Sequence, residues 1–478
     1  MWSRAEVLSK TQVDVVIDDF GFTGEGFVRL EDGWLSVPGA LPGERVRVQV
    51  QSGQREGARR LFADVVEVLQ ESEQRRDPLC EYDALCRGCH LRHLTVAGEL
   101  RFKVRTVREV MERFADLKES EQPEIEVVTP QPVARGDAFR IRSRLSFERQ
   151  GDEFYLGLRT PVREAFIPMD RCPALTLPLQ RLVRTVSKSL EECVVLPLDE
   201  EMVKQGDGES QDIAPPLGLV GIKVVCPTHG VGLIDVELTP TDRKEAFDEQ
   251  VTSEAIGDWL EELATRVPDQ VGVSVGSGDF RHYVKEPRRI RVPIDKWNME
   301  IGVQDWFHAT LDPAEQVYGR MMQWLELDEQ DRLLDIGCGT GTIALMTSER
   351  VDKVVGVDAN PASIEAAEIN AVGNGRANVE FVLGGWEKSL RTLAMNDRSF
   401  TVATINPMRE PLGHRPLAFL KLLGIERLVY LGPSPEAAAK DVGELRAMGW
   451  TVTKLAAANL HPATYHTMLL VGLEFESR

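Results

Sequence analysis

A strand, a glycine turn and the start of a helix follow one another in the phrase DRLLDIGCGTGTIAL, which begins at Asp331. The apolar run ends in Asp335, and Gly337, Gly339 and Gly341 then form G-x-G-x-G. Glycines let such a turn approach a bound nucleoside without side-chain obstruction. This spacing is tighter than the G-x-G-x-x-G of dinucleotide-binding folds. The phrase therefore restricts the C-terminal part of the chain to a Rossmann-like α/β architecture.

A second acidic strand end supports the same architecture. The phrase KVVGVDANPASIEAAEINA predicts a strand that ends in Asp358 and is followed by a helix. A carboxylate at that position is well placed to accept hydrogen bonds from ribose hydroxyls. Together the two strand ends and the glycine turn predict a site for a nucleoside-containing cofactor.

Length and charge limit the classes of protein that remain. With 478 residues and 42% hydrophobic content, the chain can form roughly three domains. A net charge of −20 argues against uniform attraction to nucleic acid, so an RNA partner needs a local basic surface. No apolar run is long enough to cross a bilayer, and the first residues lack the layout of a secretory signal. We therefore expect a cytoplasmic protein.

Three of the seven cysteines, Cys80, Cys86 and Cys89, lie within ten residues of one another. The odd total argues against a secreted disulfide framework, and clustered thiolates favour a metal centre. Soft sulfur ligands suit zinc or an iron–sulfur cluster, and His90 and His93 leave a Cys3His zinc site open. Two distant cysteines, Cys193 and Cys226, are expected to be buried thiols.

The phrase FRIRSRLSF at 139–147 predicts a strand with one basic face and one apolar face. Arg140, Arg142 and Arg144 alternate with apolar residues, and guanidinium groups suit phosphate contacts. The alternatives are an RNA-contacting surface and an ordinary solvated strand face. We favour RNA contact because an acidic chain concentrates arginines here. The acidic stretch 198–217 is expected to be a surface loop.

The N-terminal region alternates short β-rich runs with glycine turns, as in VDVVIDDFG and GEGFVRLEDG. This pattern suits either a small oligonucleotide-binding barrel or an ordinary meander. The phrases VPGALPGERV and RRDP, with the C-x5-C-x2-C run that follows, resemble the TRAM barrel and iron–sulfur segment of bacterial RNA uracil-5-methyltransferases. The G-x-G-x-G turn resembles that of class I methyltransferases, and the resemblance covers the whole chain.

The resemblance implies an α/β multidomain protein in three parts. These are a TRAM-like OB barrel over 1–72, a central α+β domain with the iron–sulfur segment over 73–295, and a Rossmann-like class I methyltransferase domain over 296–478. Cys172 falls where the family's fourth ligand is expected, so it would hold one [4Fe–4S] cluster with the three clustered cysteines. S-adenosyl-L-methionine would be bound by Asp335, Gly337, Gly339, Gly341, Asp358, His308 and Asn406.

The family's chemistry requires two residues that this chain lacks. In the family a cysteine thiolate adds to C6 of uracil, C5 takes the methyl group, and a glutamate removes the C5 proton. Pro433 stands at the cysteine position in YLGPSP, and Met468 stands at the glutamate position in HPATYHTM. Neither side chain can perform the step. Cys338, inside the glycine turn, is expected to be structural.

Three substrate-facing motifs also depart from the family. D-P-P-R becomes Asn406-Pro407-Met408-Arg409, F-F-Q-x-N begins Trp306-Phe307-His308, and the aspartate of G-D-A-E becomes Gly385. We therefore expect an RNA-binding protein that keeps S-adenosylmethionine and the cluster but has lost uracil methylation. The alternatives are an active methyltransferase with another target atom, and a structural ribosome- or tRNA-associated factor without the cofactor. We expect a monomer whose partner is rRNA or tRNA, not DNA or a membrane.

Overall fold

The computed structural model describes most of the chain, in segments. These are residue 7 and residues 11–51, 59–78, 80–86, 88–129, 138–150, 153–160, 166–190, 219–238, 240–241, 243–252, 254–278, 280–305, 307–396 and 398–475. Cys193, Trp306 and the stretch 198–217 lie outside these residues. Among the helices described, none is long and apolar enough to span a membrane.

The N-terminal strands form a sheet in the order β1-β5-β6-β4-β3-β2. Its two edge strands, β1 and β2, are separated by only two residues, so the sheet closes on itself as a small barrel. This order is not that of a meander, because β1 pairs with β5 and β4 pairs with β6. Alternate residues point into an apolar core. The strands are β1 (Gln12–Val16), β2 (Asp19–Phe20), β3 (Gly26–Leu30), β4 (Gly33–Val37), β5 (Arg45–Val50) and β6 (Arg60–Gln70).

A seven-stranded sheet forms the central part, in the order β10-β9-β8-β11-β12-β13-β14. Phe139, Ile141, Leu145 and Phe147 are all buried, which confirms the predicted alternation of this segment. Helices α4 and α7 pack on the sheet through a shared apolar core. The elements are β8 (Arg142–Gln150), β9 (Glu153–Arg159), β10 (Phe166–Pro168), α4 (Leu177–Leu190), β11 (Leu219–Thr228), β12 (Val231–Leu238), α6 (Lys244–Val251), α7 (Glu254–Arg266), β13 (Gln270–Ser277) and β14 (Phe280–Lys285).

The C-terminal sheet has the order β19-β18-β17-β20-β21-β23-β22-β7. Its first five strands are parallel and β23 is antiparallel to its neighbours, so the predicted Rossmann-like architecture is confirmed here. The elements are α8 (Asp312–Leu325), β17 (Arg332–Ile336), α9 (Thr342–Thr347), β18 (Lys353–Asp358), α10 (Pro361–Gly373), β19 (Val379–Leu383), α11 (Trp386–Met395), β20 (Val402–Ile405), α12 (His414–Leu422), β21 (Arg427–Gly432), α13 (Pro435–Ala447), β22 (Trp450–Ala458) and β23 (Met468–Phe475).

Two elements from the predicted central range 73–295 belong to this C-terminal sheet instead. Helix α3 (Val96–Phe114) packs on α13 and β22, and β7 (Ile125–Val128) is the edge strand beside β22. The reason is the apolar face of α3, where Val107, Val110 and Met111 enter the same core as the sheet residues. The C-terminal unit therefore includes residues that precede the central sheet in the chain.

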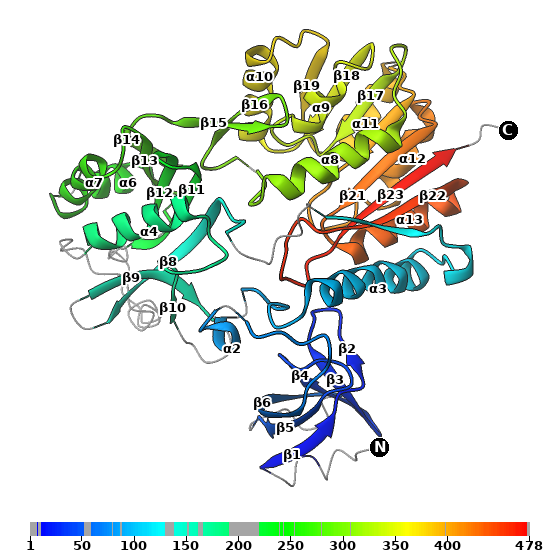
Figure 1. Cartoon of the computed structure of the whole chain (residues 1–478). Helices are drawn as coiled ribbons and strands as arrows, with labels where there is room; N and C mark the ends of the chain where they lie inside the picture. The colour runs from blue at the N-terminus through cyan, green and yellow to red at the C-terminus, as the bar shows by residue number, and fades with distance from the viewer. Residues whose placement is uncertain are drawn as a thin grey trace, which may run out of the picture.

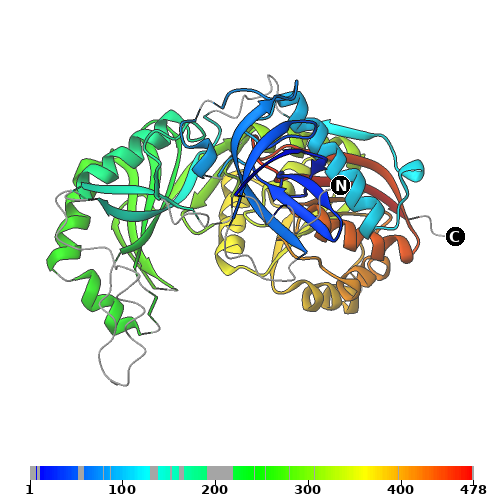
Figure 2. The same cartoon turned by 90° about the horizontal axis from the view of Figure 1, so that it is seen from below.

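Figure 1 shows the barrel below α3, the central sheet to one side, and the C-terminal sheet above. Figure 2 shows the barrel lying against the α3 side of the molecule. Phe20 of the barrel and Phe102 of α3 stack edge to face with ring centroids 5.3 Å apart. The segment 73–95, which includes the short helix α2 (Asp83–Cys86), connects the barrel to α3. The hairpin of β15 (Arg289–Ile294) and β16 (Trp297–Gly302) links the central and C-terminal sheets.

Candidate functional site

The glycine turn lies between β17 and α9, at the carboxyl end of the parallel strands. Gly337, Gly339 and Gly341 have φ values of 77°, 53° and 85°, which side-chain-bearing residues rarely adopt. A β-carbon on Gly337 would lie 2.3 Å from the backbone oxygen of Asn406. The turn therefore depends on glycine both for its conformation and for its close approach to the loop that follows β20.

Asp335 lies at the floor of this turn and is completely buried. Its Oδ1 accepts a hydrogen bond from the hydroxyl of Thr404 at 2.7 Å, while Oδ2 has no hydrogen-bond partner among the described residues. Burial raises the pKa of Asp335 to about 7. A buried oxygen without a partner is costly, so this atom points to a ligand that supplies a donor. S-adenosylmethionine carries such donors in its amino and hydroxyl groups.

Asp358 ends β18 and holds the glycine turn in place. Its Oδ2 accepts a hydrogen bond from the backbone N–H of Gly339 at 3.0 Å, and its Oδ1 accepts one from Asn360 at 2.8 Å. Each carboxylate oxygen has a second lone pair, so the group can still accept from a ribose hydroxyl. The residues present therefore fit a nucleoside-containing cofactor.

The two other predicted cofactor residues lie in different surroundings. Asn406 follows β20 and lies against the glycine turn, with its backbone N–H donating to Ile336 at 2.8 Å. His308 is buried, its Nε2 bonds to the hydroxyl of Tyr318, and burial lowers its pKa to about 4. His308 is thus a neutral imidazole held by α8. The sequence did not indicate Thr404 or Tyr318, because a lone hydroxyl in a strand or helix carries no pattern.

The family's catalytic positions hold structural residues in this fold. Pro433 follows β21, and Ser434 beside it is the N-cap of α13, where its side chain accepts from Ala437 N–H. Met468 begins β23, is 3% exposed and belongs to the apolar core. A serine occupied in capping and a buried methionine supply no nucleophile and no base.

A cavity of about 420 Å³ nevertheless remains beside Pro433. Its walls come from the β2–β3 loop, α3, the start of α13 and the segment before β23. Within it, burial lowers the pKa of His466 to about 4, so this imidazole is neutral near pH 7. The lining includes Phe22, Thr106, Arg113, Arg409, Pro433 and His466.

The four predicted cluster cysteines come from two parts of the chain. Cys80, Cys86 and Cys89 precede α3, whereas Cys172 follows β10 of the central sheet, and all four are free thiols. Burial is the largest of the causes that raise the pKa of Cys86 to about 11, and the charges of the other three thiols contribute in the same direction. As they stand, no three or more Cys, His, Asp or Glu side chains of the described residues form a metal-binding group.

Two guanidinium groups lie near these thiols. Arg92 Nη2 is 3.8 Å from Cys89 Sγ, and the charge of Arg140 lowers the pKa of Cys172 against the effect of burial. Such cations favour thiolates, the form in which sulfur binds iron or zinc. The two histidines of the zinc alternative contact other residues: His93 Nδ1 is 3.9 Å from Asp83 Oδ2, and the His90 ring packs edge to face with Tyr465.

The predicted basic strand does not present one continuous arginine row to solvent. Arg142 is turned inward, and its Nη1 donates to the backbone oxygens of Asp305 and Phe307 at 3.2 and 2.9 Å. Arg140 donates to the oxygen of Gly88, and Arg144 is exposed but forms an ion pair with Glu237 at 2.6 Å. Arg142 therefore fixes the chain near His308 and is not part of an open surface, because its guanidinium is buried and bonded to the backbone of the segment that precedes His308.

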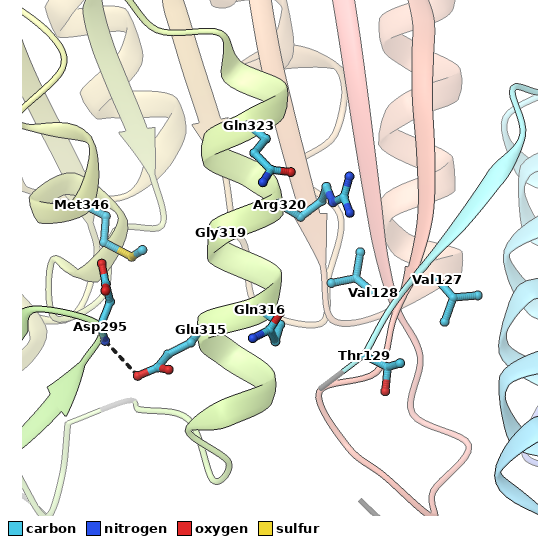
Figure 3. Close-up of a pocket in the computed structure, with 10 residues that line it drawn as sticks. All are labelled: Val127, Val128, Thr129, Asp295, Glu315, Gln316, Gly319, Arg320, Gln323 and Met346. Carbon is cyan, nitrogen blue, oxygen red and sulfur yellow. Dashed lines mark hydrogen bonds between the residues drawn. The ribbon is translucent and has the colours of Figure 1, made fainter. Parts of the chain in front are cut away.

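A separate cavity of about 530 Å³ lies between β7 and α8. Figure 3 shows Glu315, Gln316, Arg320 and Gln323 along α8, with Met346 on one side and Val127–Thr129 on the other. Its polar groups are partly paired already, since Glu315 accepts from the backbone N–H of Asp295 at 2.8 Å. It shares no lining residue with the glycine turn or with the cavity beside Pro433.

Comparison with known proteins supports the resemblance found in the sequence. A family model described as a methyltransferase domain matches residues 327–429. An uncharacterized RNA methyltransferase of Caldanaerobacter subterraneus subsp. tengcongensis is 24% identical, over 97% of this chain and 98% of the relative. The 23S rRNA (uracil(1939)-C(5))-methyltransferase RlmD of Pseudomonas entomophila is 26% identical, over 96% of this chain and 93% of the relative.

The solved structures include one match along nearly the full length. The crystal structure of Pyrococcus abyssi tRNA (uracil-54, C5)-methyltransferase in complex with S-adenosyl-L-homocysteine matches with a TM-score of 0.67 and 19% identity. The alignment covers 96% of this chain and 99% of that one. At this identity the likeness shows a shared fold.

Proposed function

Because this chain is homologous to RNA methyltransferases along nearly its whole length, we propose that it is an RNA-binding protein that no longer methylates C5 of uracil. In this proposal it binds S-adenosylmethionine at the glycine turn and a [4Fe–4S] cluster at Cys80, Cys86, Cys89 and Cys172. Its RNA is rRNA or tRNA, and it acts as a monomer in the cytoplasm, where its thiols stay reduced. The N-terminal barrel is assigned as a TRAM domain.

The observation that carries the proposal is the replacement of both catalytic groups by residues with structural roles. S-adenosylmethionine, when bound, supplies an electrophilic methyl group, but uracil C5 is a weak nucleophile until a thiolate adds to C6. Pro433 has no such group, and Met468 is buried in the core where the base would stand. The cofactor site, in contrast, keeps its glycine conformations and an unpartnered buried carboxyl oxygen on Asp335.

The cluster is supported by the chemistry of the donor set. All four residues are free thiols; Arg92 Nη2 lies 3.8 Å from Cys89 Sγ, and Arg140 donates to the backbone oxygen of the neighbouring Gly88. Cysteine-only ligation is how such clusters are held, and it leaves no iron position open to a substrate. The cluster would then connect the segment before α3 to the central sheet.

A second candidate function is methylation at another atom. It is favoured by Asn406, which lies against the glycine turn at the end of β20 and is followed by Pro407. An asparagine at this position can accept a hydrogen bond from an exocyclic amine of a base. Met408 and Arg409, which follow, supply no aromatic surface to stack on that base.

The test is transfer of labelled methyl groups from S-adenosylmethionine to unmodified cellular RNA, with the products digested to nucleosides. Cofactor binding is measured in parallel on the wild type and on Gly337→Ala, which should lose it because of the 2.3 Å approach to Asn406. Gly373→Ala is the matched control, since a β-carbon there meets nothing within 4 Å. We expect cofactor binding without label in RNA. Label in 5-methyluridine would contradict the proposal, and label in another nucleoside would establish the second candidate.

A further inference from the structure

Arg140 bonds to the backbone beside both groups of predicted cluster cysteines. Its Nη2 donates to the backbone oxygen of Gly88, which directly precedes Cys89, at 3.2 Å. Its own backbone N–H donates to the oxygen of Ala174, two residues after Cys172, at 2.9 Å. A single residue at the start of the central sheet therefore holds the stretch before α3 and the stretch after β10 together.

The next two residues bind the connection between β16 and α8. The backbone N–H of Ile141 donates to the oxygen of Ala309 at 2.9 Å. Arg142 Nη1 donates to the oxygens of Asp305 and Phe307 at 3.2 and 2.9 Å. A buried guanidinium without acceptors is costly, so these bonds hold the strand and the connection together.

The β16–α8 connection is in turn packed against the glycine turn. Phe307 is 4% exposed and belongs to the same apolar core as Leu345 of α9, the helix that follows the turn. Asn370 of α10 is completely buried, and its Oδ1 accepts from the backbone of β16 at 2.6 Å. Its Nδ2 donates to the oxygen of Thr340, inside the glycine turn, at 3.0 Å. The predicted cofactor residue His308 directly follows Phe307, so the strand holds the segment on which the cofactor site is built.

From these contacts we propose that Arg142 is a positioning residue for the cofactor site, and that residues 140–142 couple this site to the four cysteines. Metal loading and S-adenosylmethionine binding then strengthen each other. The inference rests on the proposed function, from which it takes both sites.

The physical reason for the coupling is shared order. Ligation by thiols of both cysteine stretches fixes the backbone at Gly88 and Ala174, and through Arg140 and Arg142 it fixes the β16–α8 connection. In the metal-free chain the same backbone opens locally, so cofactor binding must first order it. A coupling of this kind is reciprocal, because each ligand lowers the cost of ordering that the other meets.

The first measurement is the affinity of the intact, reduced chain for S-adenosyl-L-homocysteine by isothermal titration calorimetry. It is made on protein loaded anaerobically with iron and sulfide, and again after a chelator has removed the metal. The loaded wild type should bind about five- to 150-fold more tightly than the metal-free protein, the usual range for coupled sites. Arg142→Met should bring this ratio close to one, because the new side chain donates to neither carbonyl. Weaker binding with an unchanged ratio would leave Arg142 a purely structural role and overturn the proposal.

Three further variants test the route of the coupling. Arg144→Met is the matched control and should keep the wild-type ratio, since this guanidinium lies on the same strand but is exposed and paired with Glu237. Arg142→Lys, which keeps the charge and a donor, should restore part of the ratio. Arg140→Met should lower the ratio while Arg142 stays in place, because it removes the donor to Gly88. This last variant decides the question if Arg142→Met does not fold.

Hydrogen exchange follows the same route without a cofactor. Removal of the metal should speed exchange of the Ile141 amide and of the amides at 307–311, while the amides of β21 should keep their rates. Faster exchange confined to 80–95 would overturn the proposal. If the wild type binds metal and cofactor with a ratio of one, the coupling is wrong while the proposed function stands. If the chain loads zinc, the cluster assignment fails and the ratio measured with zinc decides the coupling; if it binds neither metal nor cofactor, both are wrong.

Discussion

The carboxyl group of Asp335 makes the stability of the fold depend on pH. Burial raises its pKa from the usual 3.8 to about 7, so the native state keeps a proton that the unfolded chain releases above pH 4. The proton on Asp335 therefore stabilises the native state fully below about pH 4, and this stabilisation is lost as the pH rises toward 7. Relative to Asp335→Asn, we expect the wild-type free energy of unfolding to fall between pH 5 and 7, by at most roughly 1.4 kcal/mol per pH unit. Chemical denaturation of the cofactor-free protein at several pH values measures this. If the difference in the free energy of unfolding between the wild type and Asp335→Asn does not change with pH, Asp335 is already ionised in the native state.

At the scale of single elements, α3 is fixed to the C-terminal sheet by a buried ion pair. Lys103 is 1% exposed, and its Nζ donates to Glu99 at 3.0 Å and to Asn459 at 2.6 Å. Glu99 also accepts from the backbone N–H of Ala463 at 3.0 Å. Lys103→Met should leave this carboxylate buried without its cation and destabilise the fold by about 3–5 kcal/mol.

Glu99→Gln combined with Lys103→Met is the control for that prediction, because it removes both charges and keeps the hydrogen bond from Ala463. The double variant should recover a large part of the lost stability, measured by denaturant unfolding. If it is no more stable than Lys103→Met, the loss comes from packing and not from an unpaired charge.

Helix α3 illustrates which features could be predicted from the sequence and which could not. The glycine turn and the alternation of buried and outward-facing side chains around Leu145 could be predicted, because both depend on the spacing of residues close together in the sequence. The place of α3 depends on contacts of Lys103 with residues more than 350 positions away, and no local pattern encodes these. The inward turn of Arg142 was missed for the same reason, because its acceptors at Asp305 and Phe307 come from another segment.

For the whole molecule, the proposed cluster would join the segment before α3 to the central sheet. Cys172 follows β10, whereas the other three precede α3, so a shared cluster would crosslink parts that otherwise meet through contacts such as Arg140 with Gly88. Anaerobically purified protein should contain about four irons per chain. Cys172→Ser should lose most of this iron and make the segment between barrel and α3 more sensitive to limited proteolysis. Cys226→Ser, at a buried thiol on the same sheet, should change neither measurement. Stoichiometric zinc in the wild type would contradict the cluster, and full iron content in Cys172→Ser would remove that cysteine from the ligand set.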